Sequence, residues 1–247
     1  MKVLLILNSL IIVSFTMANN PLPDYNVYLF PGQGSDYRVF KEIVFPENFN
    51  LHNISYPVPG KNTSMRDFAL ELSEKIDTTS PFILIGHSLG GMICTELNCI
   101  VNPEMTIIIS SAKSWNELPF RYRMLRKMPL QKIIPAKIIK AGSLILQPVV
   151  EPDRNQEKEL FVSMLKKKDP LYLKRTINMI INWQRKSLPD EIIHIHGDAD
   201  HTIPVRNVCY DHKIPGGSHM MLVTRGKEIS CLVNEIFSSL EVSHPEN

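Results

Sequence analysis

The stretch Phe82-Ile83-Leu84-Ile85-Gly86-His87-Ser88-Leu89-Gly90 decides how the rest of the chain is interpreted. It joins an apolar run typical of a buried β-strand to the pattern Gly-x-Ser-x-Gly, and residues 91–97 continue with a helical pattern. A serine at such a sharp turn has a strained backbone, and a Cβ at either flanking glycine would collide with the neighbouring strand or helix. The turn lifts the Ser88 hydroxyl out of the sheet, and the amino end of the helix favours negative charge beside it. The pattern therefore predicts a nucleophilic serine.

Apolar strand patterns alternate with amphipathic helix patterns from Tyr25 onward, which predicts an α/β fold with a mostly parallel sheet flanked by helices on both faces. The predicted strands are Tyr25 to Phe30, Leu51 to Ile54, Phe82 to Ile85, Thr106 to Ile109, Ile192 to His196 and His212 to Ile214. The predicted helices are Asp36 to Val44, Met65 to Ile76, Leu89 to Val101 and Met220 to Leu240. Thr63 or Ser64 is the expected cap of the second helix. The 247 residues are 44% hydrophobic, which is enough for one sizeable core.

Residues 113–189 depart from this alternation, because prolines separate short helical patterns and no clear strand pattern occurs. A long insertion between two sheet strands is typically functional when it covers the carboxyl ends of the strands, where α/β folds bind ligands. We interpret it as a helical cap inserted in a core domain that comprises residues 19–112 and 190–247.

The first part of this predicted cap is strongly basic. From Lys113 to Lys140 there are eight basic residues and one acid, Glu117, which gives +7 in a chain whose net charge is +2. Such a patch attracts an anionic surface or an acidic substrate, or it is a solvated helix face that keeps an apolar cap soluble. No nucleic-acid motif and no interleaved aromatic platform occur, so no nucleic-acid partner is expected.

The predicted cap also carries apolar residues at helical spacing: Phe120, Met124, Leu125, Met128 and Leu130. Two interpretations stay open for them. They bind a small or medium hydrophobic acyl or alcohol group, or they pack the cap on the sheet.

Residues 1–18 have the parts of a secretory signal peptide: Lys2 near the start, an apolar run from Val3 to Phe15, and Ala18 before an expected cleavage site. We therefore expect an exported protein, periplasmic or secreted, whose mature chain begins near Asn19. A membrane-spanning helix needs about 20 apolar residues, and the run from Val3 to Phe15 is shorter. No stable membrane span is therefore expected after signal removal. An uncleaved anchor or a buried first strand is the alternative.

The chain has four cysteines, Cys94, Cys99, Cys209 and Cys231. Neither they nor the histidines have metal-site spacing, so no metal or cofactor is expected. Cys94 and Cys99 fall on the helix after Ser88 and are predicted to be buried free thiols. Export would permit a disulfide between Cys209 and Cys231, but a sequence alone does not determine connectivity.

A serine hydroxyl needs a base, and the base needs an acid that orients it. Asp200 follows the strand that ends near His196 and is the predicted acid, whereas Asp198 directly follows a glycine and is predicted to be an Asx-type turn carboxylate. His219 follows two glycines after the last strand, and the chain order Ser, Asp, His makes it the predicted base. The rivals for the base are His201 and His212. We expect His87 to point away from the serine and to be structural.

The developing oxyanion needs hydrogen-bond donors as well. The loop Phe30-Pro31-Gly32-Gln33-Gly34-Ser35 follows the first strand, and its glycines let the backbone approach a reacting carbonyl. We predict an oxyanion hole made by the N–H groups of Gln33 and Leu89.

Together these segments resemble the α/β-hydrolase superfamily from Tyr25 to the last helix. The resemblance lies in the elbow Gly86-His87-Ser88-Leu89-Gly90-Gly91, the acid loop Gly197-Asp198-Ala199-Asp200 with Pro204, and the histidine loop Gly216-Gly217-Ser218-His219. It implies the α/β-hydrolase fold and is weakly specific for substrate. The oxyanion loop of this family often begins His-Gly, whereas this chain has Pro31-Gly32. The family's first two strands are missing from the pattern, which implies a minimal sheet.

The loop Phe30 to Ser35 also resembles the opening of malonyl-CoA:acyl carrier protein transacylases, which carry a similar Gly-His-Ser-Leu-Gly elbow. Those enzymes are longer, have an acidic residue where this chain has Gly91, and do not need the Asp200 and His219 loops. The favoured prediction is a serine hydrolase that cleaves small-molecule carboxylic esters through an acyl-enzyme. The alternatives are a thioesterase, lactonase or acyltransferase on the same fold, or a hydrolase-like binding protein with little turnover.

Overall fold

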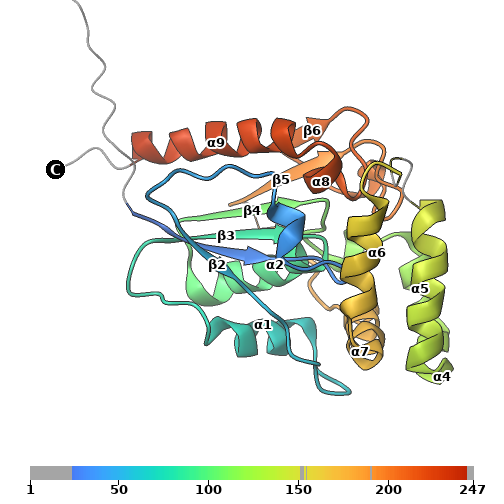
Figure 1. Ribbon diagram of the computed structural model, residues 1–247. Helices are drawn as coiled ribbons and strands as arrows, with labels where there is room; N and C mark the ends of the chain where they lie inside the picture. Colours follow the sequence, from blue (N-terminus) through green and yellow to red (C-terminus); the bar gives the residue numbers. More distant parts are fainter. Residues whose placement is uncertain (1–23, 151–152, 154, 190, 244–247) are drawn as a thin grey trace, which may run out of the picture.

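The computed structural model describes residues 24–150, 153, 155–189 and 191–243. The predicted signal peptide, residues 1–18, lies outside them. Figure 1 shows a central sheet between two layers of helices, with further helices standing beyond one end of the strands.

The sheet has six strands in the order β2-β1-β3-β4-β5-β6, and every neighbouring pair is parallel. The strands are β1 (Asn26–Phe30), β2 (Asn50–Asn53), β3 (Phe82–His87), β4 (Met105–Ile109), β5 (Ile192–Gly197) and β6 (His212–Ile214). Each lies within two residues of its predicted bounds. The predicted fold class is therefore confirmed.

Alternate residues of the inner strands enter two separate cores, because successive side chains point to opposite faces of a sheet. Val27 and Leu29 belong to the core beneath α9 (Gly226–Ser243), whereas Tyr28 and Phe30 belong to the core beneath α1 (Met65–Ser73) and α2 (Leu89–Val101). Helix α9 covers one face of the sheet, and α1 and α2 cover the other (Figure 1). The inner strands are buried on both faces, which explains their unbroken apolar runs.

Local capping fixes where helices begin. Ser64 caps α1: its hydroxyl accepts from the Asp67 N–H while the Asp67 carboxylate accepts from the Ser64 N–H, a reciprocal capping box. Helix α2 begins directly after Ser88 and has the predicted bounds. Of the two predicted cap residues, Thr63 and Ser64, the structure therefore has Ser64 as the cap.

Three predicted helices differ from the structure. The helix expected at Met65 to Ile76 begins as predicted but ends at Ser73. Of the helix expected at Asp36 to Val44, only the 3₁₀ turn η1 (Tyr37–Phe40) forms. The Asp36 carboxylate accepts hydrogen bonds from the N–H and from the guanidinium of Arg38, and these bonds hold a single turn. The helix expected at Met220 to Leu240 is divided into α8 (Met221–Thr224) and α9. The break falls at Arg225, and α9 begins at Gly226, where a Cβ would lie 2.1 Å from the Glu42 Cβ.

Five α-helices lie between β4 and β5, and no strand occurs there among the described residues. They are α3 (Phe120–Lys127), α4 (Leu130–Ile133), α5 (Ala136–Val150), α6 (Lys158–Lys167) and α7 (Pro170–Ile181). We call residues 113–189 the insertion. Helices α3, α4 and α5 pack on α7, and the carboxyl end of α7 packs on the core through Met179 and Ile180. The insertion stands at the carboxyl end of the sheet (Figure 1).

All four cysteines are free thiols in the structure. Cys94 is buried as predicted, but Cys99 is exposed, so that prediction is wrong for Cys99. It lies near the end of α2, where its Sγ accepts a hydrogen bond from Arg185 at 3.3 Å. Cys209 and Cys231 are both exposed and are not bridged.

Candidate active site

The turn between β3 and α2 holds Ser88 in a strained conformation with φ 52° and ψ −118°. The glycines around it are required by close backbone contacts. A Cβ on Gly86 would lie 2.5 Å from the Gly90 carbonyl oxygen, and a Cβ on Gly90 would lie 2.0 Å from the Phe30 carbonyl oxygen. A Cβ at either glycine of the Gly-x-Ser-x-Gly pattern would therefore collide with backbone atoms, as the sequence predicts.

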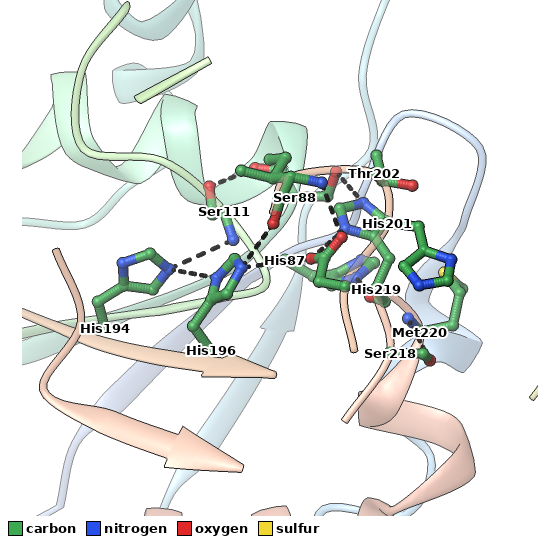
Figure 2. Close-up of polar contacts among 12 residues, drawn as sticks. His87, Ser88, Ser111, His194, His196, His201, Thr202, Ser218, His219 and Met220 are labelled. Atoms are coloured by element: carbon green, nitrogen blue, oxygen red, sulfur yellow. Dashed lines mark hydrogen bonds and ion pairs between the residues drawn. The ribbon is translucent and has the colours of Figure 1, made fainter. Parts of the chain in front are cut away.

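Ser88, His219 and Asp200 are brought together from three loops. His219 Nε2 lies 2.8 Å from Ser88 Oγ, and His219 Nδ1 lies 2.8 Å from Asp200 Oδ2. Figure 2 shows the His219 ring beside Ser88. Because a carboxylate only accepts, Nδ1–H donates to Asp200 and Nε2 is left to accept from the serine hydroxyl. This is the arrangement in which an imidazole can remove the proton of a nucleophile.

Asp200 is buried, with 2% of its surface exposed. Burial raises the pKa of this carboxyl, but the facing His219 and the hydrogen bonds from His219 and from the Ile203 N–H outweigh burial and lower the pKa below its usual value. The charged form that orients His219 is therefore the stable one at neutral pH.

Asp198, two residues earlier, joins the acid loop to the histidine loop. Its Oδ1 accepts a hydrogen bond from the Gly216 N–H at 2.6 Å, so its partner is 18 residues away and the predicted Asx-type turn is wrong. The two loops also touch directly, since a Cβ on Gly197 would lie 2.1 Å from the Gly217 carbonyl oxygen. These contacts set the height of His219 above the sheet.

Two further histidines form a chain behind the acid, and no pattern in the sequence indicates that they lie there. His196 Nε2 lies 3.5 Å from Asp200 Oδ2 and 2.8 Å from the Ile203 carbonyl, while His196 Nδ1 lies 3.0 Å from His194 Nε2. His194 Nδ1 in turn lies 2.8 Å from the Cys209 carbonyl oxygen. Burial lowers the pKa of both rings. They place polar ring atoms in the buried space beneath Asp200.

His87 is buried next to the loop of His219 and also lines the cavity that contains Ser88. Its Nε2 lies 2.9 Å from the His219 carbonyl oxygen, so Nε2–H donates and supports the loop that carries the predicted base. Burial is the main cause that lowers the pKa of His87 to about 3. The ring is therefore neutral at physiological pH.

The buried neutral histidines predict a loss of stability in mild acid. The pKa of His87 and that of His194 are each lowered to about 3, whereas an unfolded histidine titrates near 6.5. Below about pH 6.5 the unfolded chain binds protons that the folded chain does not, so the free energy of unfolding falls as the pH falls through this window. We expect a loss of about 1 kcal/mol for each of these histidines between pH 6 and pH 5. Urea unfolding at the two pH values measures it, and a His87→Gln variant with an unchanged slope would contradict the assignment.

The loop after β1 is tied to the insertion by Gln33. Its side-chain amide donates to the Leu173 carbonyl at 3.0 Å and to Thr176 Oγ1 at 2.6 Å, both on α7. Leu89 is the first residue of α2, where N–H groups have no partner within the helix. Gln33 lines the same cavity as Ser88. The role of the two N–H groups as oxyanion donors stays a prediction.

A cavity of about 410 Å³ opens in front of Ser88 and His219, between the core and the insertion. The insertion supplies most of its apolar wall, namely Leu118, Tyr122, Leu125, Phe161, Met164, Leu165, Leu173, Ile177 and Ile180. Of the five apolar residues singled out in the sequence, only Leu125 lines this cavity. Phe120, Met124, Met128 and Leu130 are exposed, so they neither line the cavity nor pack on the sheet.

Two other residues that sequence reasoning missed hold the site in place. Ser111 Oγ donates to the Ser88 carbonyl at 2.7 Å. Asp153, in the insertion, accepts from Ser218 Oγ at 2.8 Å and from Thr224 Oγ1 at 2.5 Å, which fixes both sides of His219. Neither residue lies in a recognisable motif. The rivals for the base lie elsewhere: His201 is exposed, and His212 is half-buried on β6.

The described residues also bear on metal binding and on membrane insertion. Within them no group of three or more His, Cys, Asp or Glu side chains is placed to hold a metal ion. None of the helices in the described ranges is both long and apolar enough to cross a membrane.

Comparison with known proteins gives a consistent result. The chain is 28% identical over 207 residues to a pimeloyl-[acyl-carrier protein] methyl ester esterase of Wigglesworthia glossinidia brevipalpis, a match that covers 72% of this chain and 79% of that protein. No family model matches the chain.

Solved structures resemble the fold along most of its length. An esterase from Exiguobacterium antarcticum superposes with a TM-score of 0.62 at 14% identity, covering 87% of this chain and 92% of that one. A thermophilic esterase from Thermogutta terrifontis gives a TM-score of 0.65 at 14% identity, with coverages of 88% and 90%. With its parallel six-stranded sheet, its flanking helices and its serine at the β3–α2 turn, the chain has the α/β-hydrolase fold of these esterases.

Proposed function

We propose that this protein is a serine hydrolase that cleaves carboxylic esters of hydrophobic acids. The observation that carries the proposal is the hydrogen-bonded line from Ser88 Oγ through His219 to Asp200, at 2.8 Å for each step, at the edge of an apolar cavity. The esterase named among its relatives supports the same reaction class.

In the proposed mechanism, His219 Nε2 takes the hydroxyl proton as Ser88 Oγ attacks the ester carbonyl carbon. The carbonyl electrons move to oxygen, and the N–H groups of Gln33 and Leu89 stabilise the resulting oxyanion. When the tetrahedral intermediate collapses, the C–O bond to the alcohol breaks and the alcohol oxygen takes the proton from His219. Water then attacks the acyl-enzyme with His219 again as base, which releases the acid and restores Ser88.

The insertion acts in this proposal as a cap over the reacting centre. Helices α3, α5, α6 and α7 each contribute side chains to the cavity that also contains Ser88. A cavity of about 410 Å³ with apolar walls suits an acyl group of small or medium size. We place the acyl group there because the wall offers few polar partners for a charged or sugar-like alcohol.

The test is hydrolysis of p-nitrophenyl esters, from acetyl to palmitoyl, by the full chain and by a Ser88→Ala variant. We expect turnover with an optimum at an intermediate acyl length and its loss in the variant. A folded protein without serine-dependent turnover on any of these esters would overturn the proposal.

Leu125→Trp is expected to shorten the preferred acyl chain, because the larger side chain fills the cavity that Leu125 lines. The quantity to compare is kcat/KM for the longest ester that the native protein hydrolyses well, divided by kcat/KM for the acetyl ester. We expect this ratio to fall about 10-fold in the variant, the effect of losing roughly one or two methylene contacts. Met124→Trp is the matched control, since Met124 precedes Leu125 and its side chain is 46% exposed. Equal chain-length profiles for the two variants would show that the acyl group lies elsewhere.

We also propose that residues 1–18 direct export and are removed. N-terminal sequencing of the protein recovered from its native cells tests this directly. A mature chain beginning near Asn19 is expected, and an intact Met1 would contradict it.

A further inference from the structure

The outer helices of the insertion expose apolar side chains to an unusual degree. Eight large apolar residues between 120 and 145 are exposed, which is half of all such residues in the part of the chain that the structure describes. They are Phe120 (66%), Met124, Met128, Leu130, Ile133 (79%), Ile134, Ile138 (60%) and Ile145 (70%). We call these side chains, with the basic residues among them, the outer surface. Exposed apolar side chains gathered in one segment of a folded protein are typical of interaction sites.

The exposed apolar residues are ordered along the helices. On α3, Phe120 and Met124 are four residues apart and so share one face, and the exposed Met128 directly follows the helix, while Tyr122 and Leu125 line the cavity. On α5, Ile138 and Ile145 are seven residues apart and share a second outward face. Because α3 and α5 both pack on α7, their exposed apolar residues lie on the sides that α7 does not cover.

The same segment is basic and contains no acid. Residues 118–150 include seven Lys and Arg and no Asp or Glu. Three of the seven are held within the protein: Arg121 donates to the Thr202 carbonyl, Arg126 lies 4.9 Å over the Trp115 ring, and Lys140 donates to the carbonyls of Lys166 and Lys168. None of these partners is a carboxylate, so no positive charge is neutralised.

The remaining four basic residues are Arg123, Lys127, Lys132 and Lys137, and all four are exposed. Among the described side chains, no carboxylate forms an ion pair with any of them. Lys113, by contrast, is buried and paired with Asp211 at 3.2 Å, so it does not belong to the outer surface. The partner that fits this surface must therefore offer negative charge and an apolar phase together.

We propose that the outer surface docks on an anionic phospholipid bilayer. In-plane helices with apolar side chains flanked by Lys and Arg bind such surfaces, because the apolar groups enter the acyl region while the basic groups meet the phosphates. A second copy of this chain would satisfy the apolar side chains but would bring seven further positive charges against the first seven. An acidic protein would satisfy the charge, but its surface would also have to match eight apolar side chains distributed over residues 120–145.

Docking in this way would set the cavity beside the lipid. Tyr122 and Leu125 on the inner face of α3, and Ser143 on α5, line the cavity that contains Ser88. An ester dissolved in the bilayer would then reach the serine without crossing bulk water. This consequence rests on the proposed function, but the docking itself does not, since it is measured without hydrolysis.

The first test is flotation of the full chain with vesicles of phosphatidylcholine alone and of phosphatidylcholine with phosphatidylglycerol. We expect binding to the anionic vesicles at least 10-fold tighter, and weaker as salt rises because screening weakens surface charge attraction. Equal affinity for the two vesicle types, or no affinity for either, would overturn the proposal.

Substitutions separate charge from apolar insertion. The triple variant Arg123→Gln, Lys127→Gln, Lys137→Gln is expected to bind at least 10-fold more weakly than Lys186→Gln, Lys213→Gln, Lys227→Gln, which removes the same charge from other exposed positions. Phe120→Ser with Ile138→Ser and Ile145→Ser is expected to weaken binding as much. Val44→Ser with Leu70→Ser is its control, because these two side chains are 71% and 57% exposed on the core. Equal losses in a test variant and its control would contradict a docking role for these helices.

Hydrogen exchange locates the contact independently of residues 1–18, which are common to every variant. Peptides from residues 120–145 are expected to exchange more slowly with anionic vesicles than without them. Protection confined to other segments, or a dimer in solution that the apolar triple variant dissociates, would assign this surface to a different contact and overturn the proposal.

Discussion

His219→Ala is expected to lower kcat for ester hydrolysis about 10⁶-fold, the loss seen when the base of a serine triad is removed. The reason is that His219 is the group within 2.8 Å of Ser88 Oγ that can take its proton. Asp200→Asn is expected to cost about 10⁴-fold, because an amide in place of the carboxylate stabilises the wrong imidazole tautomer. Steady-state kinetics on the best p-nitrophenyl ester measure both losses.

Matched variants make this prediction specific. His201→Ala, His212→Ala and Asp198→Asn change the same residue types, and we expect at most a few-fold effect on kcat for the two histidines. Asp198→Asn removes charge at the Gly216 contact but keeps an oxygen that can accept its hydrogen bond, so it is also expected to stay within about 10-fold of the native chain. A large loss in one of these controls, with near-native activity in His219→Ala, would mean that the base or the acid has been assigned to the wrong residue.

The strands of the sheet and the turn that carries Ser88 could be predicted because each depends on the pattern of neighbouring residues in the sequence. A short apolar run such as Ile83 to Ile85 indicates a buried strand without any knowledge of its neighbours. Gly90 is required because the turn brings its backbone against the adjacent strand β1. The chain order of Ser88, Asp200 and His219 then narrowed the partners to two loops, because loops at the carboxyl ends of parallel strands meet at one edge of the sheet.

The supporting residues could not be predicted in the same way. His196 lies 3.5 Å from Asp200, and Asp153 holds the loop of His219, but each depends on how separate segments pack. Nothing in the residues beside either position indicates its partner. The sequence also could not say which face of α3 would be inward, since Phe120 and Leu125 are both apolar and only the packing on α7 distinguishes them.

Gly90→Ala is expected to destabilise the protein by about 3 kcal/mol or to prevent folding, at the upper end of what overpacking costs. The new Cβ would lie 2.0 Å from the Phe30 carbonyl oxygen and 2.5 Å from its carbon. Both atoms belong to the backbone at the end of β1, so no side-chain rotation relieves the overlap and α2 must move away from the sheet.

Such a movement would carry Ser88 with it, because Ser88 lies two residues before Gly90 in the same turn. A displacement of about 1 Å typically costs 10²-fold in rate, so any folded Gly90→Ala protein should also lose kcat by at least that factor. Gly142→Ala is the control: it lies within α5, a Cβ there meets nothing within 4 Å, and alanine is the better helix former by about 1 kcal/mol. Urea unfolding should therefore move in opposite directions for the two variants. Equal stability of Gly90→Ala and the native chain would show that β1 and α2 do not approach as closely as this geometry requires.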